Sequence, residues 1–418
     1  MSKFRSEFPA LAGEQIFFDN AGGSQILGTV IEAIRDYLSR TNVQLGATYK
    51  TGKLATERYD AGFAAGARYI NAATSEIVFG ASTTQLFRNV SFALKFAEGD
   101  EIVISSIDHE ANIAPWLDLA RRQKLVIKWW TPETETPLLP SSSSSNPNPN
   151  PNPQLLPSNL TPLLTSRTRL VTCTHVSNVL GSIHPIADIA AAVRAGPSPD
   201  ALVVVDGVSY APHRALDVRA LDVDVYAFSW YKVYGPHIAM LYASPRAQGQ
   251  MRSLGHFFKK GDTLEEKVGL AGASYELLHA IPAVTNYLIP PPSSSSSSSP
   301  FWVEAAAHEE VLQTRLLQYL TGRPDVTIYG DVTGSSEARV ATVSFRVAGW
   351  PSRDVVAAIE TNADIGFRWG GFYSERLVRD LLGLDEDGVV RVSLVHYNTE
   401  DEVGKFIHAM ETYVPKKA

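Results

Sequence analysis

Short apolar runs alternate with helix-like segments between about residues 60 and 245 of the chain. Such alternation predicts a mostly parallel sheet with helices on both faces, and ligands of these sheets bind at the carboxyl ends of the strands. The expected strands are 76–79, 101–105, 125–129, 169–174, 201–206 and 223–229. The expected helices between them include 84–96, 113–122 and 186–194.

The chain after residue 300 predicts a smaller α+β unit. Its pattern changes to a helix at 301–319, strands at 338–347 and 389–395, and a helix at 400–413. Two units are also expected because 418 residues are more than one compact core usually holds. We therefore predict an N-terminal segment that packs on the small domain, then a large domain and a small domain. Their expected bounds are 1–18, 19–288 and 301–418.

Two low-complexity segments interrupt this pattern. Residues 137–157 and 289–300 are rich in Pro, Ser or Asn and cannot bury much apolar surface. Both are therefore expected to be exposed and flexible. The first extends a loop inside the large domain, and the second lies near the domain boundary.

The composition excludes several classes of function. The net charge of −7, with no cluster of Lys and Arg, argues against nucleic acid or a membrane surface as a partner. No apolar run of about 18 residues predicts a transmembrane helix. The N-terminus lacks the apolar core of a signal peptide, so we expect a cytoplasmic protein. Cys173 is the single cysteine, which excludes an intramolecular disulfide and a multi-cysteine metal site.

Polar residues follow the expected strands. Asp206 ends one run and Lys232 lies just past the next, before the Gly-Pro turn at 235–236. Taken alone, the first could be a cap or turn residue and the second a surface lysine. Together they suit pyridoxal 5′-phosphate, which needs a lysine imine and an acid that keeps its pyridine nitrogen protonated. Hydroxyls at 82–84, at the start of a helix, would suit the phosphate, although ordinary helix capping explains them equally well.

Six motifs in order resemble the cysteine-desulfurase-like branch of the class V aminotransferases. They are Ser-Thr-Thr (82–84), Asp-His-Glu-Ala-Asn (108–112), His-Val-Ser-Asn-Val-Leu-Gly (175–181), Asp-Gly (206–207), Ser-x-x-Lys-x-x-Gly-Pro (229–236) and Arg-Val-Ser-Leu-x-x-Tyr-Asn-Thr (391–399). Further segments, such as Lys-Trp-Trp at 128–130, are similar to fungal secondary-metabolism members of the loline and ustiloxin pathways. The resemblance implies an α/β protein of PLP fold type I (aspartate aminotransferase-like) and a homodimer.

The resemblance also implies roles for individual residues. Lys232 would carry the cofactor and move a proton, Asp206 would hold the pyridine nitrogen, and His109 would stack on the ring. Without the resemblance, His109 would be a helix-start histidine. The other expected cofactor contacts are Asn178 at the phenolic oxygen, Thr83, Thr84 and Ser229 at the phosphate, and Tyr231 and Ser209, where the family usually has His and Gln.

Three residues form the expected substrate site. Arg391 matches the arginine that grips the substrate α-carboxylate; its alternative is an exposed position on a strand. Arg368 precedes Trp-Gly-Gly and would suit a second carboxylate, or lie on a plain surface turn. Asn20 completes the set.

The chain departs from the desulfurases at the loop that carries their cysteine. Residues 365–373 contain no thiol, and Cys173 lies in an expected strand. We therefore expect an enzyme that acts on an α-amino acid through an external aldimine and a carbanion. The expected reaction is carbon–carbon bond formation of aldol or Mannich type, including decarboxylative forms and forms that follow β- or γ-elimination, and it would need a carbonyl or imine co-substrate. The alternatives are a lyase, racemase or aminotransferase, then a cysteine desulfurase, and lastly a non-catalytic member of the family.

Overall fold

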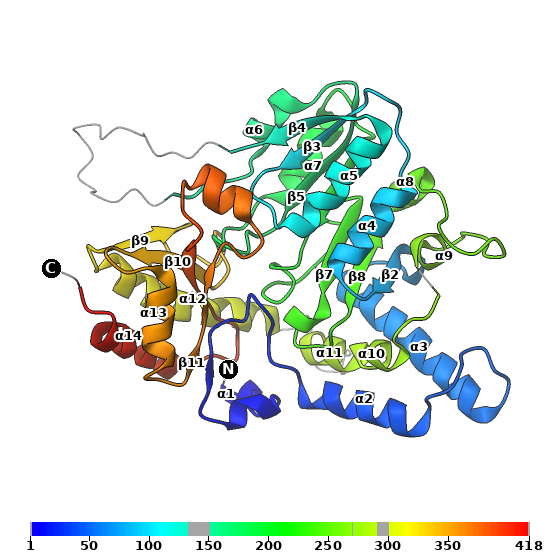
Figure 1. The fold of residues 1–418 in the computed structure, drawn as a ribbon. Helices are drawn as coiled ribbons and strands as arrows, with labels where there is room; N and C mark the ends of the chain where they lie inside the picture. The colour runs from blue at the N-terminus through cyan, green and yellow to red at the C-terminus, as the bar shows by residue number, and fades with distance from the viewer. Residues whose placement is uncertain (1, 133–150, 270, 291–300, 417–418) are drawn as a thin grey trace.

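A seven-stranded mixed sheet forms the centre of the large domain (Figure 1). The computed structural model describes residues 2–132, 151–269, 271–290 and 301–416. Strand β8 runs antiparallel to both of its neighbours, and the other pairs are parallel. In spatial order the strands are β2 (Ile77–Gly80), β8 (Ala239–Ala243), β7 (Val225–Ser229), β6 (Leu202–Asp206), β5 (Thr168–Thr174), β3 (Glu101–Ser105) and β4 (Val126–Trp130). This architecture confirms the predicted α/β fold type I.

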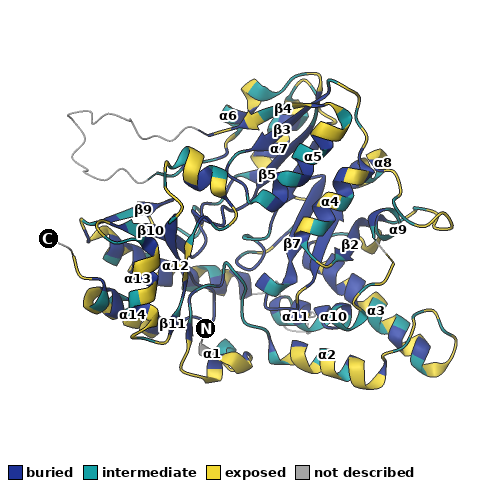
Figure 2. Cartoon of the chain, viewed as in Figure 1, coloured by how far each residue is buried: buried dark blue, intermediate teal, exposed yellow. Residues whose placement is uncertain are grey.

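The central strands are buried because helices cover both faces of the sheet (Figure 2). In β6, Leu202 and Val204 pack in the same cluster as α4 (Thr83–Ala93) and α5 (Ala114–Gln123). Val203 and Val205 point the other way and pack with α3 and α7. The helices of the large domain are α2 (Gly28–Arg40), α3 (Lys50–Tyr69), α4, α5, α6 (Pro157–Leu160), α7 (Ile186–Ala195), α8 (Pro245–Gln250), α9 (Leu264–Val268), α10 (Tyr275–His279) and α11 (Ile281–Leu288).

The small domain is an antiparallel sheet packed against three helices. Its strands, in spatial order, are β12 (Arg368–Gly370), β13 (Val389–Ser393), β10 (Thr342–Val347) and β9 (Val326–Tyr329). Its helices are α12 (Phe301–Thr321), α13 (Ser352–Glu360) and α14 (Glu400–Tyr413). The predicted elements are confirmed within a few residues, except that β10 begins at Thr342 rather than at 338.

The N-terminal segment contacts both domains. After α1 (Ser2–Arg5), β1 (Ile16–Phe17) pairs in parallel with β11 (Ile365–Gly366) of the small domain. Phe8 lies instead in the core cluster of the large domain and packs on Tyr234. The segment predicted to pack on the small domain therefore also lies against the large one.

The first low-complexity segment is only partly as predicted. Residues 133–150 lie outside the described part, as do 291–300 of the second segment. Residues 151–157 were predicted to be exposed and flexible, and this is wrong for several of them. Leu155 is fully buried, and the Pro151 carbonyl accepts a hydrogen bond from Gly330 at 2.9 Å. These residues pack because distant segments provide partners: the Ser182 hydroxyl donates to Asn152 Oδ1 at 2.6 Å, and the Leu155 N–H donates to His184 Nδ1 at 3.3 Å.

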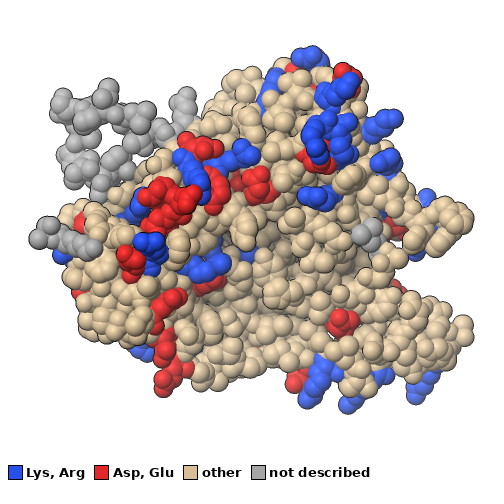
Figure 3. All heavy atoms as spheres, viewed as in Figure 1, with Lys and Arg blue, Asp and Glu red and all other residues tan. Residues whose placement is uncertain are grey.

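The surface in Figure 3 carries interspersed acidic and basic side chains, without a continuous stripe of Lys and Arg on that face. None of the described helices is long and apolar enough to cross a membrane.

Candidate active site

Two adjoining cavities lie at the carboxyl ends of the parallel strands. The inner cavity has a volume of about 80 Å³ and the outer one about 350 Å³. They share four lining residues, which are His109, Asn178, Tyr231 and Lys232. All nine residues expected to contact the cofactor line the inner cavity: Lys232, Asp206, Asn178, His109, Thr83, Thr84, Ser229, Tyr231 and Ser209.

The amine of Lys232 is prepared for covalent chemistry. Lys232 ends a short 3-10 turn that directly follows β7 and is 8% exposed. Burial, and then the positive charge of Arg391, lower the pKa of Lys232 to about 8. Within the described residues its nitrogen has no hydrogen-bond or ion-pair partner. A buried, unpaired amine with a lowered pKa fits the lysine that binds an aldehyde cofactor.

Asp206 is the acid of the inner cavity. It ends β6, and burial raises the pKa of its carboxyl to about 6. Oδ1 accepts a hydrogen bond from the Val208 N–H at 2.9 Å. Because the carboxyl has no arginine or lysine partner among the described residues, it remains available to a protonated pyridine nitrogen.

The start of α4 forms an anion site. Ser82 caps the helix by accepting a hydrogen bond from the Gln85 N–H at 3.1 Å. The Thr83 and Ser229 hydroxyls lie 2.8 Å apart and join the helix terminus to the end of β7. Free N–H groups of a first helical turn and adjacent hydroxyls are donors that a phosphate accepts from. The donor set of the inner cavity therefore fits pyridoxal 5′-phosphate.

His109 is a neutral imidazole between the two cavities. Its Nδ1 accepts a hydrogen bond from the Ala111 N–H at 3.0 Å, which places the proton on Nε2. Burial, followed by the charges of Lys232 and Arg391, lowers the pKa of His109 to about 4. A neutral, fixed ring is suited to stacking on a flat cofactor.

Asn178 connects the cofactor site to the loop after β12. Its Nδ2 donates to the Phe372 carbonyl at 2.9 Å, and its Oδ1 accepts from the Ser374 hydroxyl at 2.8 Å. The second hydrogen on Nδ2 remains available for the expected contact with a phenolic oxygen.

Arg391 lies on β13 but is buried, which excludes the alternative of an exposed arginine on a strand. It is 2% exposed, and its guanidinium lies 3.8 Å from the centre of the Phe372 ring. Nη1 donates to the Asn178 carbonyl at 3.1 Å and Nη2 to Asp19 Oδ1 at 3.0 Å, while the buried Nε has no partner among the described residues. Arg391 thus retains donor capacity toward the outer cavity, which it lines.

Arg368 lines the outer cavity but is already paired. Its Nε lies 2.6 Å from Oδ2 of Asp19, so this one carboxylate bridges two guanidinium groups. Arg368 lies directly opposite Arg391 on the adjacent strand. Like charges in such positions repel, and Asp19 compensates one of the two.

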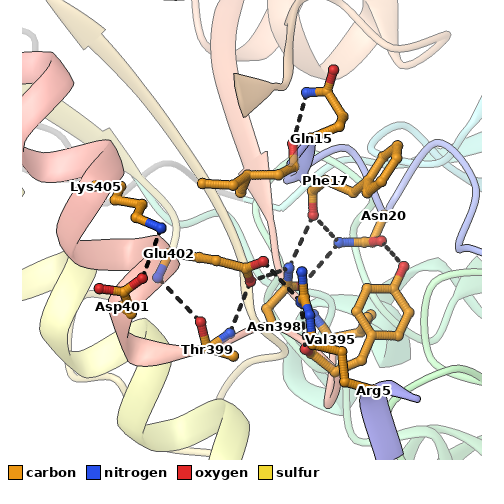
Figure 4. A network of polar contacts seen from close by, with 12 residues as sticks. Arg5, Gln15, Phe17, Asn20, Val395, Asn398, Thr399, Asp401, Glu402 and Lys405 are labelled. Atoms are coloured by element: carbon orange, nitrogen blue, oxygen red, sulfur yellow. Dashed lines mark hydrogen bonds and ion pairs between the residues drawn. The ribbon is translucent and has the colours of Figure 1, made fainter. Parts of the chain in front are cut away.

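Asn20 does not line either cavity and lies instead in a network of polar contacts that includes Phe17 and Asn398 (Figure 4). Its Nδ2 donates to the carbonyls of Phe17 at 2.9 Å and Ser393 at 2.8 Å, and its Oδ1 accepts from the Tyr397 hydroxyl. The structure therefore gives Asn20 a role in holding the N-terminal segment on the small domain, and its neighbours Ala21 and Gly22 line the cavity instead.

Sequence reasoning missed several residues of the outer cavity. Phe372, Tyr373 and Glu375 line it, and Asp19 pairs with both of its arginines. The available signals were an acid directly after the short apolar run 16–18 and two aromatic residues after two glycines, but neither signal specifies a partner.

The chain belongs to the class V aminotransferase family, whose model matches residues 16–406. It is 52% identical to the aminotransferase-like protein FGM3 of Gibberella zeae, over 97% of this chain and 96% of that protein. It is 39% identical to the cysteine desulfurase-like protein ustD of Aspergillus flavus, over 99% and 90%. A cysteine desulfurase from Thermococcus onnurineus shares the fold, with a TM-score of 0.84, 24% identity, and 98% and 96% of the two chains covered.

The chain is accordingly a PLP-dependent enzyme, and pyridoxal 5′-phosphate is its cofactor. The geometry of the inner cavity agrees with this, because it gathers a lysine, an acid, a neutral imidazole and an anion site around one small space.

Proposed function

We propose that the enzyme forms a carbon–carbon bond between an α-amino acid and a carbonyl or imine partner, rather than transferring sulfur. The observation that carries the proposal is the loop after β12. It lines the outer cavity beside Lys232 with Phe372 and Tyr373, next to Trp369 of β12, and contains no thiol.

The one thiol of the chain is unsuited to sulfur transfer. Cys173 lies in β5, is fully buried, and lines neither cavity. Burial raises the pKa of its thiol well above the ordinary value. Because the thiolate is the form that takes sulfur from a substrate, Cys173 cannot serve as the acceptor.

Bound at this site, pyridoxal 5′-phosphate supplies an electron sink for negative charge on the substrate carbon. Asp206 keeps the pyridine nitrogen protonated. The Lys232 amine, with a pKa of about 8, takes up and returns a proton at the substrate carbon. Arg391 orients the substrate through its α-carboxylate.

The charges of the outer cavity favour an amino acid with one carboxylate. Asp19 compensates one of the two arginines, and Glu375 is paired with Arg379 at 2.7 Å. The remaining positive charge suffices for an α-carboxylate. The sequence suggested that Arg368 binds a second substrate carboxylate, but its ion pair with Asp19 leaves it less available for that role.

A screen of α-amino acids paired with aldehydes tests the proposal. Products with a new carbon–carbon bond, detected by mass, are expected from the wild-type enzyme and not from Lys232→Ala. Cysteine should yield little sulfide, and Cys173→Ser should change this little. Strong sulfide release that Cys173→Ser abolishes would contradict the proposal. Cleavage of the amino acid, inversion at its α-carbon or release of a keto acid would assign a lyase, racemase or aminotransferase instead.

The same proposal includes the setting of the reaction. We place the enzyme in fungal secondary metabolism, in the cytoplasm and as a homodimer. Its similarity to proteins of two filamentous fungi supports the first of these. Sedimentation of the holoenzyme tests the dimer.

A further inference from the structure

Phe372 and Tyr373 are two consecutive non-glycine residues with left-handed backbone. Their φ angles are +54° and +59°, and Gly370 before them has a φ of +127°. Bulky residues seldom adopt this conformation, and they keep it only where the surrounding structure holds them. The turn therefore stores strain in the wall of the outer cavity.

Three hydrogen bonds to the large domain hold this turn. Asn178 Nδ2 donates to the Phe372 carbonyl at 2.9 Å, and the Glu110 N–H donates to the Tyr373 carbonyl at 2.8 Å. The Ser374 hydroxyl donates to Asn178 Oδ1 at 2.8 Å. Asn178 lines both cavities, and so does His109, which directly precedes Glu110. The residues that hold the turn are therefore part of the cofactor site or adjacent to it.

The two aromatic rings of the strained turn contact different residues. Phe372 lies under the guanidinium of Arg391, at 3.8 Å. Tyr373 has its ring centre 5.3 Å from that of His109 and lines the outer cavity but not the inner one. Tyr373 is 73% exposed, so its ring borders the open, solvent-facing side of the outer cavity, away from the inner one.

Other proton carriers of the outer cavity have different partners or tasks. His109 is neutral, since burial lowers its pKa to about 4, and Glu375 is paired with Arg379. Lys232 serves the substrate carbon. Tyr231 lines both cavities, and its ring is stacked on His237 with centres 4.9 Å apart.

We propose that the Tyr373 hydroxyl is the proton donor to the carbonyl oxygen of the second substrate; this rests on the function proposed above. As the new carbon–carbon bond forms, the π electron pair of the carbonyl moves to its oxygen. That oxygen takes the phenolic proton, and the phenolate regains a proton from water. In the reverse direction the phenolate accepts the hydroxyl proton while the carbon–carbon bond breaks.

Tyr373→Phe tests the hydroxyl while keeping the ring. We expect kcat for the carbon–carbon product to fall about a hundredfold, within the usual range for a general acid. The affinity of the holoenzyme for the amino acid, and exchange of its α-hydrogen with D2O, should stay within about twofold, because binding and proton removal precede the step. Tyr231→Phe is the comparison. Because Tyr231 lines both cavities, any loss it causes should affect exchange and addition alike.

Tyr373→Gly tests the strain independently of activity. Cofactor-free Tyr373→Gly should melt on the order of 1–2 °C above cofactor-free Tyr373→Ala, because both lack the ring and only alanine keeps a side chain that strains a backbone at positive φ. A lower or unchanged melting temperature would show that no strain is stored in the turn.

Two results would overturn the role of Tyr373, namely an unimpaired kcat in Tyr373→Phe, or an equal loss of exchange and addition. A wild-type enzyme that forms no carbon–carbon product with any carbonyl partner would instead refute the proposed function.

Discussion

Replacing Arg391 by methionine should raise the pKa of Lys232 and slow the uptake of pyridoxal 5′-phosphate near neutral pH. Lys232 has a pKa of about 8 in place of 10.5, first through burial and second through the charge of Arg391. At pH 7.5 about a quarter of the amine is then neutral, against about one part in a thousand for an ordinary lysine. The difference corresponds to about 3 kcal/mol between the two protonation states.

The sign of the effect follows from the chemistry, since only the neutral amine attacks an aldehyde. The rate of cofactor uptake by the cofactor-free protein should therefore rise with pH, with a midpoint near 8. In Arg391→Met the midpoint should move upward but stay below 10.5, because burial is the larger cause and remains. Arg391→Lys keeps the charge and should keep the midpoint close to that of the wild type.

Stopped-flow absorbance at a series of pH values measures this midpoint. The same series with Nα-acetyllysine corrects for the titration of the cofactor itself. A wild-type midpoint near 10, or one that Arg391→Met leaves in place, would refute the reasoning.

The other predictions concern the phosphate site, the two arginines paired with Asp19, and the buried side chain of His396. Thr83→Val, which removes the hydroxyl 2.8 Å from Ser229, should weaken cofactor binding by about 1.5–3 kcal/mol, measured by equilibrium dialysis; an unchanged affinity would remove Thr83 from the site. Asp19→Asn frees Arg368 and should improve binding of glutamate relative to glutamine about tenfold by calorimetry, and an unaltered ratio would contradict the charge argument. His396 has a pKa of about 3 when folded, lowered by burial, so stability is lost as pH falls below its ordinary 6.5. His396→Phe should therefore reduce the loss in unfolding free energy between pH 6.5 and 5 by about 2 kcal/mol in urea titrations, and an equal loss in both proteins would argue against a buried neutral imidazole.

The nine residues expected at the cofactor lie together around the inner cavity, whereas one of the three expected at the substrate, Asn20, lines neither cavity. Asp206 and Ser229 end their strands, and Lys232 ends the short turn after β7, so the sheet itself brings them together. Asp19 could not be placed in this way. It meets Arg391 across 372 positions of the chain, through the packing of the N-terminal segment on the small domain. No local pattern encodes such a contact.

The positions of Asn20 and of residues 151–157 differ from expectation for the same physical reason. Asn20 was expected at the substrate, but the pairing of β1 with β11 turns its amide toward carbonyls of the small domain. Residues 151–157 have the composition of a flexible segment, yet Leu155 finds a buried place against the large domain. The composition of a segment indicates how much apolar surface that segment can bury by itself. The position of Asn20 and the burial of Leu155 instead depend on contacts with residues far away in the sequence.

The contact of Asp19 with Arg391 has a consequence for the order of synthesis. The inner cavity is lined by residues 82 to 232, so all of its lining side chains have left the ribosome while the small domain is still to be made. The outer cavity can be completed only later, because Arg391 is translated near the end of the chain. Asp19, among the first residues to emerge, thus remains without its two cationic partners until translation is almost finished. A ribosome-bound chain stopped before residue 368 would hold every residue that lines the inner cavity and neither of the two arginines that line the outer one.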